Sequence, residues 1–135
     1  MAYDFAGKTV SYISSGNLSA KQFYPVKAGT AVGSVALQTS TGGVTIGILQ
    51  NTPSTAGGDG ASVMVDGITK AVKISTATAA ITRGAAIVVG TTLGGLGPTT
   101  GKGFVIGRAE SSMSSGTTGL FVLRITMEGI GSTGW

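Results

Sequence analysis

The sequence predicts an all-β fold: a small single-domain β-barrel or sandwich with an extended N-terminal arm. The apolar segments are short, rich in Val and Ile, and separated by Gly, Ser, Thr and Asp-Gly turn signals. The 24 glycines in 135 residues suit turns, while 41% hydrophobic and 10% charged residues are the opposite of the signature of disordered chains. The third observation is an internal repeat.

A three-part pattern of strand-like segments occurs twice in the chain. The first copy comprises residues 26–32, 43–49 and 60–65, and the second comprises residues 81–89, 103–109 and 119–125. Three glycine pairs align the copies, at offsets of 55, 60 and 59 residues: Gly29 with Gly84, Gly47 with Gly107, and Gly60 with Gly119. We interpret this as a degenerate duplication of a three-strand unit. Two copies are too few for an open solenoid, so we expect two interlocked halves closing one barrel or sandwich, because closure removes exposed sheet edges.

Three regions are predicted: an aromatic-rich arm at residues 1–25, a β-barrel-like core at residues 26–128 and a flexible tail at residues 129–135. Most of the aromatic residues fall in the first region: Tyr3, Phe5, Tyr12, Phe23 and Tyr24. Two interpretations of these rings stay open. They cap an open end of the barrel, or they form an arm that packs on a partner, since aromatic residues are enriched in interface cores. The tail ends on Trp135, which is either disordered or docked.

The strands of the first half are predicted from alternation and β-branched content. Residues 8–14 alternate loosely and are followed by a Ser-Ser-Gly-Asn turn. Residues 30–37 and 43–50 alternate apolar with small polar side chains. Residues 28–58 carry no charge, which is compatible with a surface buried inside the protein or between subunits.

The second half begins after two Asp-Gly pairs, at 59–60 and 66–67, which predict turns. Strands are therefore expected at 61–65 and 68–74. A short helical turn is predicted over residues 75–82, because Ser75 can cap it and alanines follow. The remaining predicted elements are strands at 85–89, 104–109 and 120–127, with a flexible loop over 90–101 and a Ser/Gly-rich loop over 110–118.

The composition argues against an enzyme and against a bound metal or cofactor. The chain has no cysteine and no histidine, which excludes disulfides, thiolate ligands and nucleophile–base pairs built on those residues. The carboxylates are Asp4, Asp59, Asp66, Glu110 and Glu128. None forms a close pair or a calcium-binding run in sequence, although Asp59 and Asp66 flank one strand. No catalytic residue, metal ligand or cofactor site is therefore predicted.

Three further classes of protein are disfavoured: phosphate-binding proteins, membrane or secreted proteins, and nucleic-acid-binding proteins. The loop at 51–60 lacks the Gly-Lys-Ser/Thr ending and the following helix of a phosphate-cradling loop, so a plain β-connection is expected. The longest apolar runs, 85–89 and 120–123, are far below the ~20 residues of a membrane helix, and residues 1–8 lack a secretory-signal pattern. The net charge of +4 is spread along the chain, which disfavours direct nucleic-acid binding.

A series of segments in the middle of the chain carries a family resemblance. They are residues 64–74 (MVDGITKAVKI), 81–87 (ITRGAAI), 103–109 (GFVIGRA) and a closing strand at 122–125. Their order resembles the capsid cement, or head-decoration, family of tailed phages, whose pattern is a G-v-x-x-v strand, an alanine-rich turn, an i-x-x-G-a-x-v strand, i-G-x-A and a closing strand. The likeness covers roughly residues 26–128 and rests on glycines and apolar spacing.

The resemblance implies a β-barrel-like structural protein on the outer capsid surface of a phage virion. It implies the major capsid protein as partner, a homotrimer as the common oligomer, and no membrane contact or direct nucleic-acid contact. Such a protein works through modest contacts repeated by symmetry. We expect these partner-binding residues: Tyr3, Phe5 and Tyr12 as arm contacts, with Lys8 and Lys21 meeting an acidic shell surface.

Two alternative functions stay open. A carbohydrate-binding or adhesive β module on a virion or cell surface predicts exposed aromatic residues on the barrel. A small nucleic-acid-associated barrel predicts salt-sensitive binding to arbitrary DNA.

Overall fold

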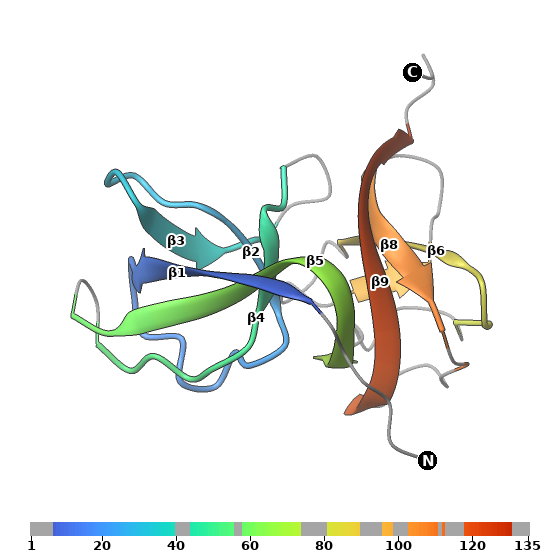
Figure 1. Cartoon of the computed structure of the whole chain (residues 1–135), viewed down its shortest axis with the longest axis horizontal. Coiled ribbons are helices and arrows are strands. Elements are labelled where there is room, and N and C mark those ends of the chain that lie inside the picture. The colour runs from blue at the N-terminus through green and yellow to red at the C-terminus, as the bar shows by residue number, and fades with distance from the viewer. Residues whose placement is uncertain are drawn as a thin grey trace.

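The computed structural model describes residues 7–39, 44–55, 58–73, 81–89, 96–98, 103–110, 112 and 118–130. These residues contain strands and no helix (Figure 1). The strands are β1 (Lys8–Ser14), β2 (Pro25–Ala28), β3 (Ser34–Leu37), β4 (Gly47–Leu49), β5 (Gly60–Lys73), β6 (Ala86–Val89), β7 (Leu96–Pro98), β8 (Gly103–Ala109) and β9 (Thr118–Ile130). The predicted all-β class is confirmed.

The first five strands form a closed barrel. Neighbouring strands lie in the order β1-β3-β2-β4-β5, and β1 pairs with β5 to close the ring. The pairings are antiparallel except that of β1 with β3, in which Ile13 lies beside Ser34. Closure gives each of the five strands a paired neighbour on both sides, which is the advantage that a small β protein gains from a barrel.

Strand β5 is shared between the barrel and a second sheet. Its first half pairs with β1 and β4, and its second half, from Gly67 to Lys73, pairs with β9. The change of partner occurs at Gly67, whose φ of 113° is readily adopted only by glycine. The predicted turn at Asp66–Gly67 is therefore wrong, because this pair marks a change of direction within one strand. The second sheet continues from β5 in the order β9-β8-β6-β7, and it lies beside the barrel (Figure 1).

The two halves of the chain repeat one four-strand unit. Strands β2 to β5 are joined in the order β3-β2-β4-β5, and strands β6 to β9 in the order β7-β6-β8-β9. The registers agree as well. Val26 lies opposite Gly47, and Ile87, which follows Val26 by 61 residues, lies opposite Gly107, which follows Gly47 by 60. The duplication is present, and each copy has four strands instead of three.

Two other details of the predicted duplication are corrected. Gly47 and Gly107 are equivalent as expected, but the residue equivalent to Gly84 is Phe23 and not Gly29. The copies also do not close one barrel between them. The first copy forms the closed barrel together with β1, and the second copy forms the sheet that continues from β5.

The interior of the barrel is filled by aliphatic side chains, here called the barrel core. It follows the alternation of the strands: Ala61 and Val63 are fully buried, and Ser62 between them is partly exposed. The buried members are Leu18, Val26, Val35, Leu49, Ala61 and Val63. Each large side chain buried in this way contributes about 1.5–3 kcal/mol to folding.

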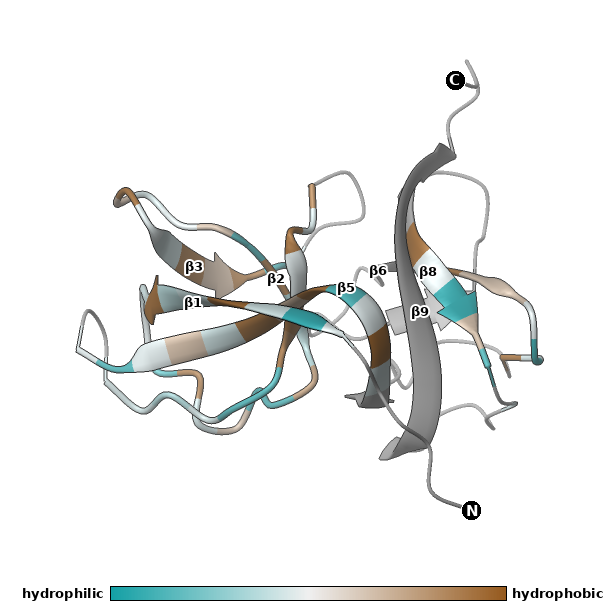
Figure 2. Cartoon of the chain, viewed as in Figure 1, coloured by the Kyte–Doolittle hydropathy of each residue, from teal (hydrophilic) through white to brown (hydrophobic). Residues whose placement is uncertain are grey.

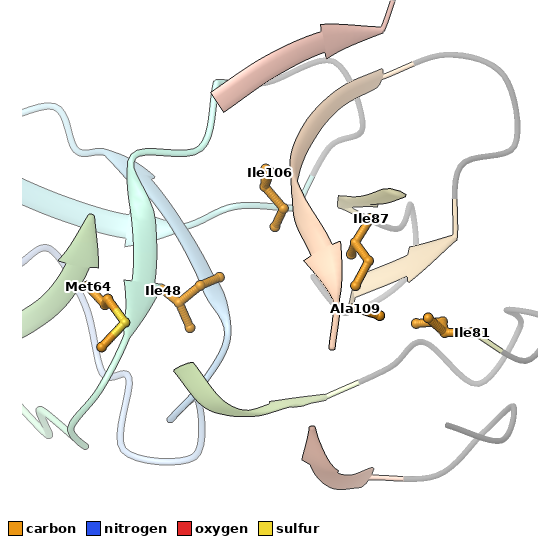
Figure 3. Close-up of a cluster of buried hydrophobic side chains, with 6 residues drawn as sticks. All are labelled: Ile48, Met64, Ile81, Ile87, Ile106 and Ala109. Carbon is orange, nitrogen blue, oxygen red and sulfur yellow. The ribbon is translucent and has the colours of Figure 1, made fainter. Parts of the chain in front are cut away.

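A second cluster, here called the inter-unit cluster, joins the barrel to the second sheet. Ile48 on β4 and Met64 on β5 come from the barrel, and the other buried members come from the second copy: Ile81, Ile87, Ile106 and Ala109 (Figure 3). Phe23 and Ala85 pack against its edge. The apolar contact between the copies explains why they form one structural unit.

The N-terminal region is largely part of the barrel. Strand β1 pairs with β5 from Lys8 to Ile13, and Leu18 and Tyr24 are buried. The predicted boundary at residue 25 is therefore corrected for residues 8–25, which pack as a barrel strand and its connection instead of an arm. Residues 1–6 lie outside the described residues, as do residues 131–135 of the predicted tail.

Several predicted elements differ in extent. The strand predicted at 30–37 begins at Ser34, because residues 30–33 form the turn after β2, and the strand predicted at 43–50 covers only Gly47–Leu49. Ile81 forms a β-bridge where the helical turn was expected to end, and residues 74–80 lie outside the described residues. Strand β7 lies within the predicted loop at 90–101, where Gly and Pro obscure its strand character.

Candidate functional site

Of the predicted partner-binding residues, the structure describes Lys8, Tyr12 and Lys21. Tyr3 and Phe5 lie outside the described residues. Tyr12 is half-buried against the barrel core. Lys8 is exposed but lies directly across from Asp66 in the β1–β5 pair, and the Nζ of Lys21 lies 5.0 Å from the centre of the Tyr24 ring. Tyr12, Lys8 and Lys21 thus each have a neighbour within the chain that accounts for their placement.

The feature that stands out instead is an exposed apolar end of the barrel, here called the barrel tip. It consists of Ile13 at the end of β1 and the turn 30–33 between β2 and β3. Val32 is fully exposed and Ile13 is 49% exposed. Ala31 beside Val32 is exposed too. The turn and the end of β1 both carry the colour of apolar residues (Figure 2).

Hydrogen bonds fix the geometry of the barrel tip. The backbone N–H of Ile13 donates to the carbonyl of Gly33 at 2.9 Å, which joins the two parts of the tip. The carbonyl of Ala31 accepts from the backbone N–H of Ser34 at 3.1 Å and from its hydroxyl at 2.7 Å. Gly33 has a φ of 72°, the left-handed conformation that glycine adopts without strain. The exposed valine is therefore carried on a preorganised turn.

Close packing below the turn holds it in place. Gly29 donates its N–H to the carbonyl of Ser34 at 2.8 Å. A Cβ added at Gly29 would collide with the hydroxyls of Ser15 and Ser34. A side chain at this position would displace the turn, so the glycine is needed for the shape of the tip.

The glycine-rich loop 51–60 has a structural role. The Asp59 carboxylate accepts hydrogen bonds from the N–H groups of Ser54 and Thr55 at 2.7 and 2.9 Å, and from the Ser54 hydroxyl at 2.9 Å. These hydrogen bonds, led by the Ser54 N–H, hold the pKa of Asp59 below its ordinary value of 3.8. The N–H groups of Ser54 and Thr55 are therefore occupied by the chain's own carboxylate and are not available to an external phosphate.

Asp59, which precedes β5, and Asp66, which lies within it, do not form an acid–base pair. Asp59 and Asp66 are seven residues apart along an extended strand, a separation of about 23 Å. Within the described residues, no group of three or more His, Cys, Asp or Glu side chains is placed to hold a metal ion. No helix in the same residues is long and apolar enough to cross a membrane.

The barrel tip was not among the predicted site residues. The only signal for it in the sequence is the uncharged stretch 28–58, which contains the turn and is compatible with a surface buried either inside the protein or between subunits. The sequence does not indicate that Ile13 lies beside this stretch, because the two are brought together only by the parallel pairing of β1 with β3 in the folded chain. No protein-family model matches the sequence, and no curated protein matches it.

Proposed function

We propose that this chain is a structural protein of a phage virion, which binds the outside of an icosahedral head and stabilises contacts between major capsid proteins. The observation that carries the proposal is the barrel tip, with Val32 fully exposed on a hydrogen-bonded turn. An apolar anchor on a preorganised support suits a recess on a protein partner, since little conformational entropy is lost when it binds. The family resemblance of residues 26–128 supplies the class of partner.

The closed barrel supports a mechanical role. The tip lies at the ends of β1 and β2, which are paired with the remaining strands of the ring. A force applied to the tip is thus distributed over the backbone hydrogen bonds of a closed sheet. This is the arrangement that a protein bridging shell subunits needs.

Multivalency supplies the affinity. Full burial of one Val or Ile side chain is worth about 1.5–3 kcal/mol, which is too little for stable attachment by a monomer. A homotrimer presents the tip three times, and linked contacts increase the overall affinity by several powers of ten. A trimer on the outer surface of the head is therefore part of the proposal.

The carbohydrate-binding alternative gains no support from the rings. Tyr12 and Phe23 are half-buried against the two apolar clusters, and Tyr24 is buried. None of the aromatic side chains described in the structure is therefore exposed as a stacking platform for sugars.

The proposal is tested by light scattering coupled to size-exclusion chromatography, followed by co-sedimentation with emptied phage heads stripped of decoration protein. We expect a trimer that binds the heads saturably and in stoichiometric amounts. A monomer that stays in the supernatant at every concentration would overturn the proposal.

A further inference from the structure

A negatively charged residue, Asp59, lies beside the barrel tip. Gly60, which follows Asp59, is paired with Ile13 in the β1–β5 pair, and the carbonyl of Asp59 accepts a hydrogen bond from the backbone N–H of Ser14 at 3.2 Å. The turn 30–33 lies on the other side of Ile13, since Ile13 donates its N–H to the last residue of the turn. Neighbouring strands are about 4.8 Å apart, so the backbones of Asp59 and of the turn flank Ile13 at a separation of about 10 Å.

Asp59 is also the only charged residue in the parts of the chain that form this end of the barrel. Residues 9–20 contain the end of β1, residues 28–58 contain the turn, and residues 60–65 begin β5, and none of these stretches carries a charge. Lys27 on β2, just before the second stretch, is the cation closest to the turn in the sequence. The chain as a whole has a net charge of +4, whereas these parts of the chain have their one charge in the carboxylate of Asp59.

The loop 51–60 occupies one of the two carboxylate oxygens of Asp59. The three hydrogen bonds from Ser54 and Thr55 all end on Oδ2, and Oδ1 accepts none of them. Asp59 is partly exposed, and it forms no ion pair with any residue that the structure describes. The carboxylate is ionised at neutral pH, because the Ser54 N–H and the other donors hold its pKa below the ordinary value. A partner can therefore reach a charged oxygen next to the tip.

Closing the loop is the simpler explanation for Asp59, because Asp and Asn side chains commonly accept hydrogen bonds from the backbone of a turn. It accounts for an oxygen at this position but not for the charge. Asn17 makes the same kind of contact with a neutral amide, whose Oδ1 accepts from the backbone N–H of Ser19 at 3.0 Å and from its hydroxyl at 2.7 Å. A neutral residue would therefore close the loop without placing a charge beside an apolar surface.

The charge of Asp59 becomes important when the tip is buried against a partner. A carboxylate at the edge of a protein contact loses part of its hydration, and this loss lowers the affinity unless the partner supplies an opposite charge. Apolar contacts are also non-directional, whereas a charge-assisted hydrogen bond fixes one orientation. The combination of Val32, Ile13 and Asp59 is thus suited to an apolar recess with a cation at its rim.

We propose that the barrel tip docks into an apolar recess of a protein partner, and that a Lys or Arg at the rim of this recess pairs with Oδ1 of Asp59. The inference rests on the proposed function, which it deepens: the recess belongs to the capsid shell, and the shell is basic where the tip binds. This sign is opposite to that of the acidic surface expected to meet Lys8, and Lys8 lies at the other end of β1 from Ile13. The two ends of one strand thus face surfaces of opposite charge.

Nucleic acids and acidic proteins fit this site less well. Both bring negative charge toward the carboxylate of Asp59, and the stretches 9–20 and 28–58 contain no cation that would offset the repulsion. A recess without any charge is the remaining alternative, and the dependence of binding on salt distinguishes it from a basic one.

The experiment compares three variants of the full chain in co-sedimentation with emptied phage heads. Asp59→Asn keeps an acceptor oxygen for the loop and removes the charge. Asp66→Asn removes the same charge at the other end of β1, where Asp66 is exposed opposite Lys8. Ser54→Ala removes one hydrogen bond of the loop and keeps the charge. Circular dichroism and urea unfolding at neutral pH establish that all three variants are folded.

We expect Asp59→Asn to bind the heads about tenfold more weakly than the native chain at about 50 mM salt, and the difference to shrink at about 500 mM, because salt screens an exposed ion pair. Asp66→Asn and Ser54→Ala should bind within about threefold of the native chain. Equal losses in Asp59→Asn and Asp66→Asn would overturn the inference, since binding would then follow net charge. An equal loss in Ser54→Ala, or a loss in Asp59→Asn that persists at high salt, would also overturn it and assign Asp59 a purely structural role.

A second assay does not depend on phage heads. The probes are hexylammonium, an alkyl chain that ends in a cation, and hexanol, which has the same chain without the charge. NMR follows the backbone amides of isotope-labelled protein as each probe is added at millimolar concentrations. We expect hexylammonium to shift the amides of Ile13, Val32 and Asp59 at lower concentrations than hexanol does, and Asp59→Asn to abolish this preference. Equal responses of the native chain to both probes would contradict the inference.

The two assays separate this inference from the proposed function. If the native chain ignores the heads but prefers hexylammonium through Asp59, the proposed function fails and the tip remains a site for another basic protein. If the native chain binds the heads and Asp59→Asn binds equally well at every salt concentration, the inference fails and the proposed function stands.

Discussion

Phe23 and Gly84 occupy the same position in the two copies, and both have a left-handed backbone, with φ of 65° and 84°. Each donates its N–H at 2.7 Å to the last residue of the equivalent strand, Phe23 to Leu49 and Gly84 to Ala109. Each is also the third residue of a turn closed by a hydrogen bond, a position with positive φ that favours glycine. A phenylalanine is tolerated in the first copy because its ring packs against the inter-unit cluster, which offsets the strain.

The left-handed turn makes Gly84 sensitive to a side chain. A Cβ at Gly84 has nothing within 4 Å, so Gly84→Ala tests backbone conformation alone. We expect the free energy of unfolding to fall by about 1–2 kcal/mol, measured by urea denaturation. Gly16→Ala is the control, because its added Cβ also meets open space and its φ is not positive, and it should stay within about 0.5 kcal/mol of the native chain. Equal effects of the two substitutions would show that the turn is not strained.

The change of partner within β5 requires glycine at position 67. Gly67→Ala places a side chain at a φ of 113° and should cost about 1–3 kcal/mol in unfolding free energy. Gly60→Ala in the same strand is the matched control, because its Cβ meets open space without a positive φ, and its stability should be unchanged or slightly raised. A Gly67→Ala protein as stable as the Gly60→Ala protein would contradict the requirement for glycine where β5 changes its partner strand.

The inter-unit cluster should stabilise the whole chain. Ile48 is fully buried in it, and Ile48→Ala leaves a cavity between the two units that should cost about 2–5 kcal/mol. Val44→Ala, at a valine that is 58% exposed, should cost less than about 1 kcal/mol and serves as control. Thermal unfolding followed by circular dichroism measures both. Similar small losses in the two variants would indicate that the units do not rely on each other.

The Asp59 loop should make stability depend on acid pH. The folded-state pKa of Asp59 lies below 3.8, so its carboxylate stabilises the folded protein fully above this value, and the contribution is lost as pH falls through the folded-state pKa. We expect the native chain to lose more stability than Asp59→Asn between pH 5 and the acid range below 3.8, in parallel urea titrations. Identical pH profiles would mean that the carboxylate is not held by Ser54 and Thr55.

The sequence predicted the strand content because alternation survives in the longer strands. Residues 8–14 and 104–109 were correctly placed, and Gly47 and Gly107 correctly related the two copies. Gly47 fits a tight contact between neighbouring strands, because a Cβ there would overlap the carbonyl of Met64.

The alignment of the two copies by their glycines failed where one copy has a different residue in the same left-handed conformation. Phe23 takes the place of Gly84, so matching glycines led to Gly29 instead, at the wrong offset. The parallel pairing of β1 with β3 could not be predicted from the sequence either, because no sequence pattern relates these two segments. The antiparallel pairing with β5 makes residues 8–13 a barrel strand, and the parallel pairing with β3 brings Ile13 beside residues 30–33 to form the tip.

The most direct measurement is the affinity of Val32→Ser for emptied phage heads, beside Val44→Ser as the second exposed valine. We expect Val32→Ser to unfold like the native chain but to bind the heads at least about tenfold to a hundredfold more weakly, the loss expected for one buried valine, and more weakly still where all three tips of a trimer lose this contact. Val44→Ser should bind like the native chain. Native affinity in Val32→Ser, or an equal loss in both variants, would contradict the assignment of the barrel tip as the contact surface.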